Sequence, residues 1–355
     1  MKFCLISHHV PTGKWIHQLN DISVWAYAMD GDVHNGLGID DYSQFDKYDV
    51  VMVNMSFNML DICCNLKSKS KAFVIGLVEG SLIPHWPFEA LSRYKDVLNT
   101  IDMVGVINSK GLEAIRALTS KPACFIGVPY PLAWAKGHIS SAKNPIIELS
   151  TQVIGRGGIW NTIPINKLNH HVVCYPTGLT SDDIRSILEM AGPSLQFLPV
   201  KGWHEYFIEH SQYYLGLHLD QGYTWGRFPL DCAAANIPCV STPYSHTQSI
   251  LFPELVVEYY EVDKAAKLCN RLFQDKEFYN RVVDYANEHI KQFDLENSRQ
   301  RLLCCLRDQG TVAEPFPSCP VPAPPLRHNG PSHLPYEWRS AIRIHSRYSR
   351  VSRNK

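Results

Sequence analysis

The sequence lacks any apolar run approaching the ~18 residues that a membrane-spanning helix needs. Its opening apolar run, Met1–Ser7, is too short for a secretory signal and is predicted as a strand. Eleven cysteines occur, yet none forms a Cys-x-x-Cys pair, and several lie inside apolar segments. We therefore expect buried, reduced thiols in a cytoplasmic protein rather than disulfides or a zinc site.

Net charge is also absent, since 34 Lys and Arg residues balance 34 Asp and Glu residues. The balance is uneven, because residues 311–355 hold seven basic and two acidic residues, which leaves 27 basic and 32 acidic residues in 1–310. A mildly acidic body gives no sign of a large nucleic-acid footprint. The proline-rich composition after about residue 310 predicts a disordered tail over 306–355. Its basic end could bind an anionic partner, or the tail could be an inert solvated extension.

Short, continuous apolar runs alternate with helical segments in the first part of the chain. Such runs are typical of parallel strands that are buried on both faces of a sheet. The expected strands are Lys2–Ser7, Asp49–Asn54, Ala72–Val78, Ile101–Ile107 and Cys124–Val128. The pattern predicts a doubly wound domain over residues 1–131.

The mixed, polar stretch 132–147 is predicted as a linker, after which the alternation restarts. The later expected strands are Glu148–Ile154, His171–Cys174, Leu195–Leu198, Tyr214–Leu219, Cys239–Ser241 and Val256–Tyr260. Two helices, Asp263–Gln274 and Lys276–Lys291, are expected to finish a second domain over 148–305. The predicted fold is therefore α/β, with two Rossmann-like doubly wound domains that face each other across a cleft.

The most informative stretch is Tyr214–Thr242, which is predicted as strand, loop, glycine turn, short helix and strand. Gly226 permits a tight turn in which backbone N–H groups approach an anion, and a helix predicted over Pro229–Ala235 directs its positive end there. Asp231 is expected in the first turn of this helix. Its carboxylate could accept hydrogen bonds from ribose hydroxyls, or it could simply cap the helix.

This stretch resembles the donor-site motif of the GT-B retaining glycosyltransferases, the glycogen-synthase-like group. That motif reads Glu-Gly-Phe-Gly-Leu-x-x-Leu-Glu-Ala-Met-Ala-x-Gly-x-Pro-Val, and residues 223–239 follow it without a gap. Gly226, Leu230, Ala234 and Pro238 match it identically, and Asp231 replaces its second glutamate. The resemblance implies that Asp231 binds the nucleotide ribose.

Tyr223 stands where the motif has its first glutamate, which in the family lies near the donor sugar. The resemblance thus implies nucleotide binding more directly than the usual sugar chemistry. It places Tyr223 at the donor, and the backbone of Gly226 and Arg227 against the phosphate or sugar. Asp220 is a nearby carboxylate, but it is out of register with the motif.

Two further basic residues are candidates for donor binding. Ile154-Gly155-Arg156 resembles the family's Val-Gly-Arg, which implies that Arg156 binds donor phosphates; the alternative is an ordinary loop salt bridge. The family's second basic residue is missing, since Asn161 and Thr162 stand there. Lys201 matches a loop near the nucleotide base, or is a solvated surface lysine.

The first half resembles the family only in layout. Many members have a catalytic-site histidine after the strand that corresponds to Ala72–Val78, where this chain has Glu79 and then His85. These two are the candidate catalytic residues, with Glu79 as an acid, a base or a hydroxyl-orienting group, or else a solvated loop carboxylate. His8 and His9 end the first strand and are predicted to face the cleft or to be an ordinary polar loop pair.

The resemblance implies a glycosyltransferase that moves a sugar from a nucleotide-sugar donor to an unidentified acceptor, with retention. The nucleotide sugar is then a substrate, and no cofactor is expected. No metal is expected either. The alternative is a catalytically inactive GT-B-fold binding or scaffold protein. A nicotinamide-dependent dehydrogenase is disfavoured, because Leu5–Gly13 does not supply Gly-x-Gly-x-x-Gly.

Overall fold

The computed structural model describes residues 1–8, 13–14, 21–79, 88–150, 158–176 and 179–309. All the described residues belong to one compact unit, and the second unit lies outside the described residues. The predicted tail is therefore not described beyond residue 309. No helix within the described ranges combines the length and the apolar character that crossing a membrane requires.

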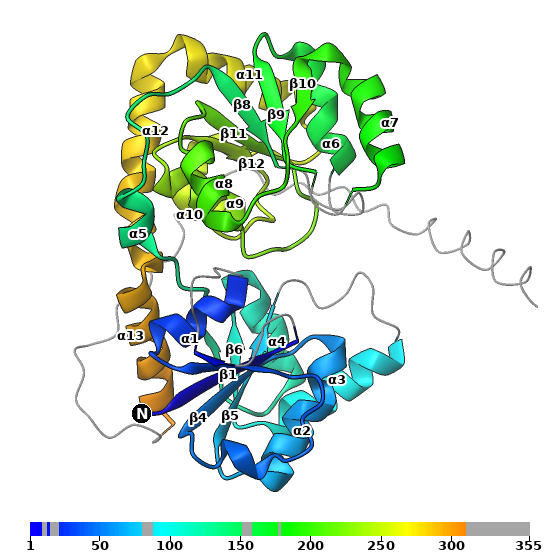
Figure 1. The fold of residues 1–355 in the computed structure, drawn as a ribbon, viewed down its shortest axis with the longest axis vertical. Coiled ribbons are helices and arrows are strands. Elements are labelled where there is room, and N and C mark those ends of the chain that lie inside the picture. Colours follow the sequence, from blue (N-terminus) through cyan, green and yellow to red (C-terminus); the bar gives the residue numbers. More distant parts are fainter. Residues whose placement is uncertain (9–12, 15–20, 80–87, 151–157, 177–178, 310–355) are drawn as a thin grey trace, which may run out of the picture. The chain divides into compact units, whose positions relative to one another are not determined.

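The first sheet has seven strands in the order β2-β3-β1-β4-β5-β6-β7 (Figure 1). All neighbouring pairs are parallel except β2 with β3. The strands are β1 (Phe3–Ser7), β2 (Gly13–Lys14), β3 (Asp32–Asn35), β4 (Val50–Asn54), β5 (Phe73–Val78), β6 (Met103–Val106) and β7 (Ala123–Phe125). The five strands that the sequence predicted here are confirmed, with shifts of a few residues at their ends.

Helices cover both faces of this sheet. Successive side chains of each strand point to opposite faces, so each face has its own hydrophobic core. Phe3 and Leu5 of β1 belong to a core shared with α1 (Val24–Ala28). Cys4 and Ile6 belong to the core shared with the other face's helices. Those helices are α2 (Leu60–Lys69), α3 (Phe88–Thr100) and α4 (Leu112–Leu118).

The second sheet has five parallel strands in the order β10-β9-β8-β11-β12. They are β8 (Ile146–Leu149), β9 (His171–Cys174), β10 (Leu195–Phe197), β11 (Leu215–His218) and β12 (Cys239–Ser241). The helices around and after them are α5 (Leu132–Lys136), α6 (Gly158–Thr162), α7 (Ser181–Ala191), α8 (Trp203–His210), α9 (Arg227–Ala234), α10 (Gln248–Leu251), α11 (Val262–Gln274), α12 (Lys276–His289) and α13 (Leu295–Arg307). Two parallel sheets in succession confirm the α/β fold class (Figure 1).

Local sequence explains several of the element boundaries. Thr180 and Asp183 form a reciprocal capping box at the start of α7, in which each side chain accepts from the other residue's backbone N–H. Asp275 and Asp294 cap α12 and α13 by accepting from the backbone N–H three residues later. Such side-chain acceptors fix where a helix begins, since they satisfy amides that have no partner within the helix.

Four features differ from the sequence-based prediction. Val256–Tyr260 is not a strand, because only Val256 pairs, in a single bridge with Ser241. The predicted linker 132–147 contains α5, and β8 begins inside it at Ile146. A third final helix, α13, extends past the predicted domain end at 305 and packs against α1. Strand β3 and helix α1 were not predicted, since β3 contains a single apolar residue and α1 is only five residues long.

Candidate functional site

The turn before α9 lies at the carboxyl end of β11, the edge where parallel sheets bind ligands. Gly226 is the N-cap of α9 and adopts a left-handed conformation with φ of 86°. A Cβ at this position would lie 2.5 Å from Thr247 Oγ1 and 3.1 Å from the Thr247 nitrogen. Glycine is therefore required here both by backbone conformation and by close packing.

This turn is fastened to the loop that follows β12. The Thr224 N–H donates to the Tyr244 carbonyl at 3.1 Å, and the His246 N–H donates to the Thr224 carbonyl at 3.0 Å. The Thr247 hydroxyl donates to the Gly226 carbonyl at 2.5 Å. The two loops at the ends of neighbouring strands β11 and β12 therefore form one paired unit that holds the start of α9 in place.

Asp231 is 3% exposed and accepts three hydrogen bonds on a single oxygen, Oδ1. The donors are the Tyr130 hydroxyl at 2.8 Å, Trp203 Nε1 at 3.1 Å and Arg227 Nε at 3.1 Å. Burial and the charge of Asp231 raise the pKa of Tyr130, so its hydroxyl stays protonated and remains a donor. The carboxylate is thus already engaged by the protein's own donors.

Arg227 is held by more than its carboxylate partner. Its guanidinium carbon lies 5.0 Å from the ring centre of Tyr130 and 4.9 Å from that of Trp203. These two rings pack edge to face against each other at 6.1 Å. Two aromatic faces and one carboxylate thereby fix a cation at the first residue of α9.

The prediction that Asp231 sits in the first turn of the helix is wrong. The helix begins at Arg227 rather than Pro229, which places Asp231 in its second turn, and the N-cap is Gly226 without a side-chain cap. The capping alternative is therefore wrong as well, since a carboxylate one turn further along cannot reach the first amides. The ribose-binding role of Asp231 stays a prediction, to which its occupied Oδ1 lends no support.

Below this turn, a layer of buried polar groups closes the ends of β8, β11 and β12. Asp220 is fully buried, and its Oδ1 accepts from the Gly222 N–H at 2.8 Å. The Thr242 hydroxyl donates to the Asp220 carbonyl at 2.5 Å. Asn161, at the position of the family's missing lysine, accepts from the Leu219 N–H at 2.5 Å. Asp220 and Asn161 therefore fasten the loops of this edge.

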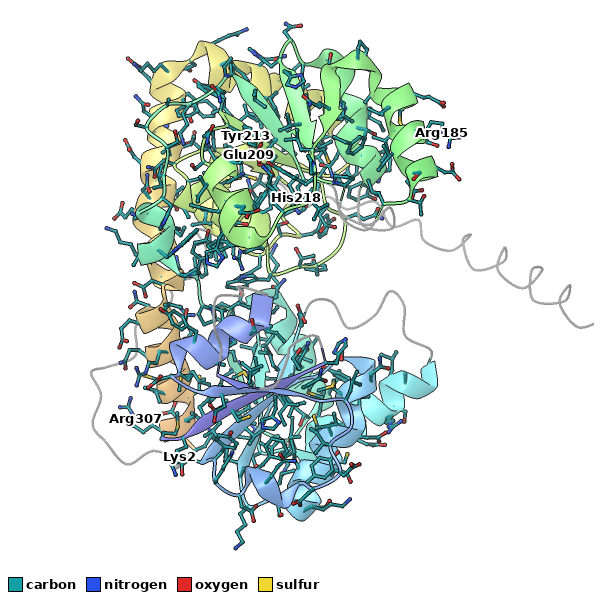
Figure 2. The ribbon with its side chains drawn as sticks, viewed as in Figure 1. Lys2, Arg185, Glu209, Tyr213, His218 and Arg307 are labelled. Carbon is teal, nitrogen blue, oxygen red and sulfur yellow. The ribbon has the colours of Figure 1, made fainter. Side chains whose placement is uncertain are left out.

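Lys201 forms an ion pair with Glu209 on the neighbouring helix α8. The Tyr175 and Tyr213 hydroxyls are hydrogen-bonded to each other at 2.9 Å, and both also interact with Glu209. Figure 2 shows Glu209 and Tyr213 close together beside the second sheet. The side chain of Lys201 is thus held by Glu209 of α8. Its contact with a nucleotide base remains a prediction.

The carboxyl edge of the first sheet carries a looser set of polar groups. Glu79 is exposed, and its Oε2 accepts from Asn54 Nδ2 at 3.3 Å. The Ser56 hydroxyl and His8 Nδ1 lie 3.3 Å apart. Because β1, β4 and β5 are neighbours, their ends bring His8, Asn54 and Glu79 to one edge. His85, His9 and Arg156 lie outside the described residues.

Sequence reasoning missed four residues of these sites. Asn54 and Ser56 could have been found, since each is among the first polar residues after the buried strand β4. Tyr130 and Trp203 had no local signal, because the hydrogen bonds that make them relevant reach 101 and 28 residues along the chain. Within the described part of the chain, no three His, Cys, Asp or Glu side chains are grouped to hold a metal ion.

No family model matches the sequence, and no curated protein matches it. Solved structures do resemble its fold. Sucrose-phosphate synthase from Thermosynechococcus elongatus has a TM-score of 0.69 at 13% identity, covering 88% of this chain and 100% of that chain. Anabaena HepE, solved with UDP and glucose, has a TM-score of 0.66 at 12% identity, covering 78% and 86%. The trehalose 6-phosphate synthase of Burkholderia multivorans has a TM-score of 0.56 at 14% identity, covering 74% and 72%. The chain therefore has the GT-B fold that these structures share.

Proposed function

We propose that this protein transfers a sugar from a nucleotide-sugar donor to an acceptor, with retention of configuration. The observation that carries the proposal is the turn at Gly226, which is fixed against Thr247 and followed by a caged arginine at the start of α9. The GT-B fold and the binding of UDP and glucose by the structural neighbour HepE support it. The helix start and the guanidinium both favour a negatively charged ligand.

In this proposal the protein supplies position and electrostatics rather than a covalent nucleophile. Arg227 and Arg156 neutralise the donor diphosphate, and the backbone at Gly226 approaches the phosphate or sugar. As the leaving group gains charge, preorganised donors stabilise it without reorganising. Glu79 and His85 are the proposed polar groups of the first sheet's edge, where they would orient the acceptor hydroxyl or receive its proton.

Asp231 enters the proposal as the group that orients Arg227. Its Oδ1 accepts from Arg227 Nε, Tyr130 and Trp203, so it holds the guanidinium between two rings. A ribose contact would require a second use of the same carboxylate. The two roles of Asp231 can be distinguished by comparing ligands. If Asp231 only orients Arg227, it should affect the affinity of ligands with phosphate groups, whereas a ribose contact should also affect the affinity of a nucleoside.

The test measures thermal shift and nucleotide release with a panel of sugar nucleotides, alongside the free nucleosides and nucleoside diphosphates. We expect one donor to stabilise the protein, by about 2.7 kcal/mol at a hundredfold excess over its dissociation constant. Arg227→Ala should weaken diphosphate ligands at least tenfold and leave nucleoside affinity unchanged. Glu113→Ala, at an exposed helix position, is the control. No stabilisation by any donor would refute the proposal.

Retention is tested separately by following the anomeric configuration of the first product by NMR. The expected product has the same configuration at the anomeric carbon as the donor. An inverted product would refute retention and leave the transferase assignment intact.

A second candidate is a GT-B-fold binding protein without turnover. Two observations favour it, namely Tyr223 at the position of the motif glutamate and the Asp231 oxygen occupied within the protein. The same panel distinguishes the two, because a binding protein would be stabilised by a nucleotide and release none from any donor and acceptor pair.

A further inference from the structure

Five aromatic side chains form a connected chain of ring contacts in the second half of the molecule. The linked ring centres lie between 5.2 and 6.3 Å apart, which is the range of favourable aromatic pairing. Tyr259 contacts three of them. These residues, which we call the aromatic platform, are Trp160, Tyr223, Tyr244, Tyr259 and Tyr260.

The platform lies at the carboxyl edge of three neighbouring strands. Trp160 follows β8, Tyr223 follows β11 and Tyr244 follows β12, and these strands are adjacent in the sheet. Connections at this edge bind the ligands of open parallel sheets. The platform is also continuous with the candidate donor site, because the Tyr244 carbonyl accepts from the Thr224 N–H two residues before Gly226.

The platform combines exposed rings with anchored ones. Tyr223 is 42% exposed and Tyr260 is 59% exposed, whereas Trp160, Tyr244 and Tyr259 are half-buried. The half-buried rings hold the exposed ones by edge-to-face contacts, so a ligand would meet a largely preformed surface. Preformed aromatic side chains supply contact area at low cost in conformational entropy.

Polar groups accompany the rings. Burial and the nearby Glu258 carboxylate raise the pKa of Tyr244 to about 12, so its hydroxyl remains protonated at neutral pH. The exposed Tyr223 and Tyr260 carry phenolic hydroxyls that can both donate and accept, which suits a ligand rich in hydroxyl groups.

We infer that the aromatic platform binds a neutral glycan, which serves as the acceptor of the proposed transfer. A pyranose ring presents C–H groups on its faces and hydroxyls on its rim, so it matches tyrosine rings that combine an apolar face with a polar tip. The exposed rings of Tyr223 and Tyr260 stand at the two ends of a row of linked rings, which favours an extended acceptor over the single sugar of a donor. This acceptor role rests on the proposed function.

The charges around the platform agree with a neutral ligand. Glu258 and Glu261 lie in the same segment as Tyr259, and Glu261 pairs with Lys264 at 3.0 Å. A nucleic acid would require a basic surface to neutralise its phosphates. The platform therefore favours hydroxyl recognition over phosphate recognition.

The experiment titrates the full chain with the neutral tetrasaccharides maltotetraose, cellotetraose and chitotetraose and with a glycan array, without donor. Binding is followed by calorimetry and by tryptophan fluorescence. We expect at least one glycan to bind, and Tyr260→Ala to weaken it at least tenfold while leaving donor affinity unchanged. Tyr260→Phe should retain most of the affinity, because the ring remains. Tyr27→Ala, at a tyrosine that is 50% exposed on α1, is the matched control.

Three outcomes would overturn the inference: no glycan binds, glycan binding survives Tyr260→Ala and Tyr223→Ala, or these variants weaken only the donor. Selective binding of a protein to the platform in place of glycans would overturn it as well. Failure of the transferase proposal has a separate signature, because donor binding and nucleotide release are measured without glycan. Glycan binding with no nucleotide release in any pairing would remove the acceptor role.

Discussion

The carboxyl edges of the two sheets are built differently. At the second sheet, one Asp231 oxygen receives three donors at 2.8 to 3.1 Å, and Gly226 is packed directly against Thr247. At the first sheet, the exposed Glu79 accepts from Asn54 at 3.3 Å, and the Ser56 hydroxyl and His8 Nδ1 lie 3.3 Å apart. The same topology thus supports one edge fixed by buried contacts and one whose described polar groups remain more open to water.

This difference suggests a division of tasks. A preorganised edge loses little conformational entropy when a ligand binds, as a donor site requires. An exposed carboxylate can change its hydrogen bonds when a second substrate arrives. Substitutions should therefore cost stability at the second edge, and should affect activity more than stability at the first.

The largest effect is expected from Asp231→Ala. Removing the carboxylate leaves a mostly buried Arg227 guanidinium without its ion-pair partner, which should lower the free energy of unfolding by about 3 kcal/mol. Urea denaturation measures the change. Asp182→Ala breaks the exposed pair with Arg185 and should cost less than about 1 kcal/mol. Equal losses in both variants would mean that the buried network contributes no more stability than an exposed ion pair.

Gly226→Ala is expected to cost about 2 to 3 kcal/mol, from left-handed strain together with the clash against Thr247. Gly38→Ala is the matched control, because Gly38 has φ of 76° but a Cβ added there would meet nothing within 4 Å. It should show only the strain, about 1 to 2 kcal/mol. The difference between the two thermal-unfolding results isolates the close packing at the second edge.

His246 should make the second edge sensitive to acid. Burial, with Lys110 and Arg301 nearby, lowers the pKa of His246 from 6.5 to about 3. Since the unfolded chain takes up the proton first, stability is present above pH 6.5 and is lost as the pH falls from there towards 3. The loss between pH 7 and pH 5 should be about 2 kcal/mol.

Chemical denaturation of the wild type and His246→Gln at the two pH values tests this expectation. The variant should lose that part of the acid dependence, whereas His171→Gln, at an exposed position, should behave like the wild type. An unchanged pH profile in His246→Gln would contradict the assignment.

The smallest effect on stability is expected from Glu79→Gln at the first edge. The side chain is exposed and its contact with Asn54 is long, so the free energy of unfolding should change by less than about 0.5 kcal/mol. If Glu79 takes part in transfer, the rate of nucleotide release with acceptor should nevertheless fall at least tenfold. A large loss of stability without a change in rate would mean that Glu79 serves the fold rather than the reaction, contrary to the proposed difference between the two edges.

Features of the site that depend on neighbouring residues could be predicted from the sequence, whereas those that depend on distant contacts could not. The Gly226 turn was predictable, because glycine before a short helix carries its own conformational signal. The start of α9 at Arg227 was not, since Pro229 favoured a later first residue.

The sequence by itself determined the two parallel sheets, because short apolar runs separated by amphipathic helices bury well only in that arrangement. It also determined the glycine turn, which depends on backbone conformation at one residue. Only the tertiary structure decided that Val256–Tyr260 is not a strand and that Asp231 holds Arg227 rather than capping its helix. Local propensity acts over a few neighbouring residues, whereas a buried carboxylate takes its partners from whatever the fold brings beside it, here Tyr130 from 101 residues away.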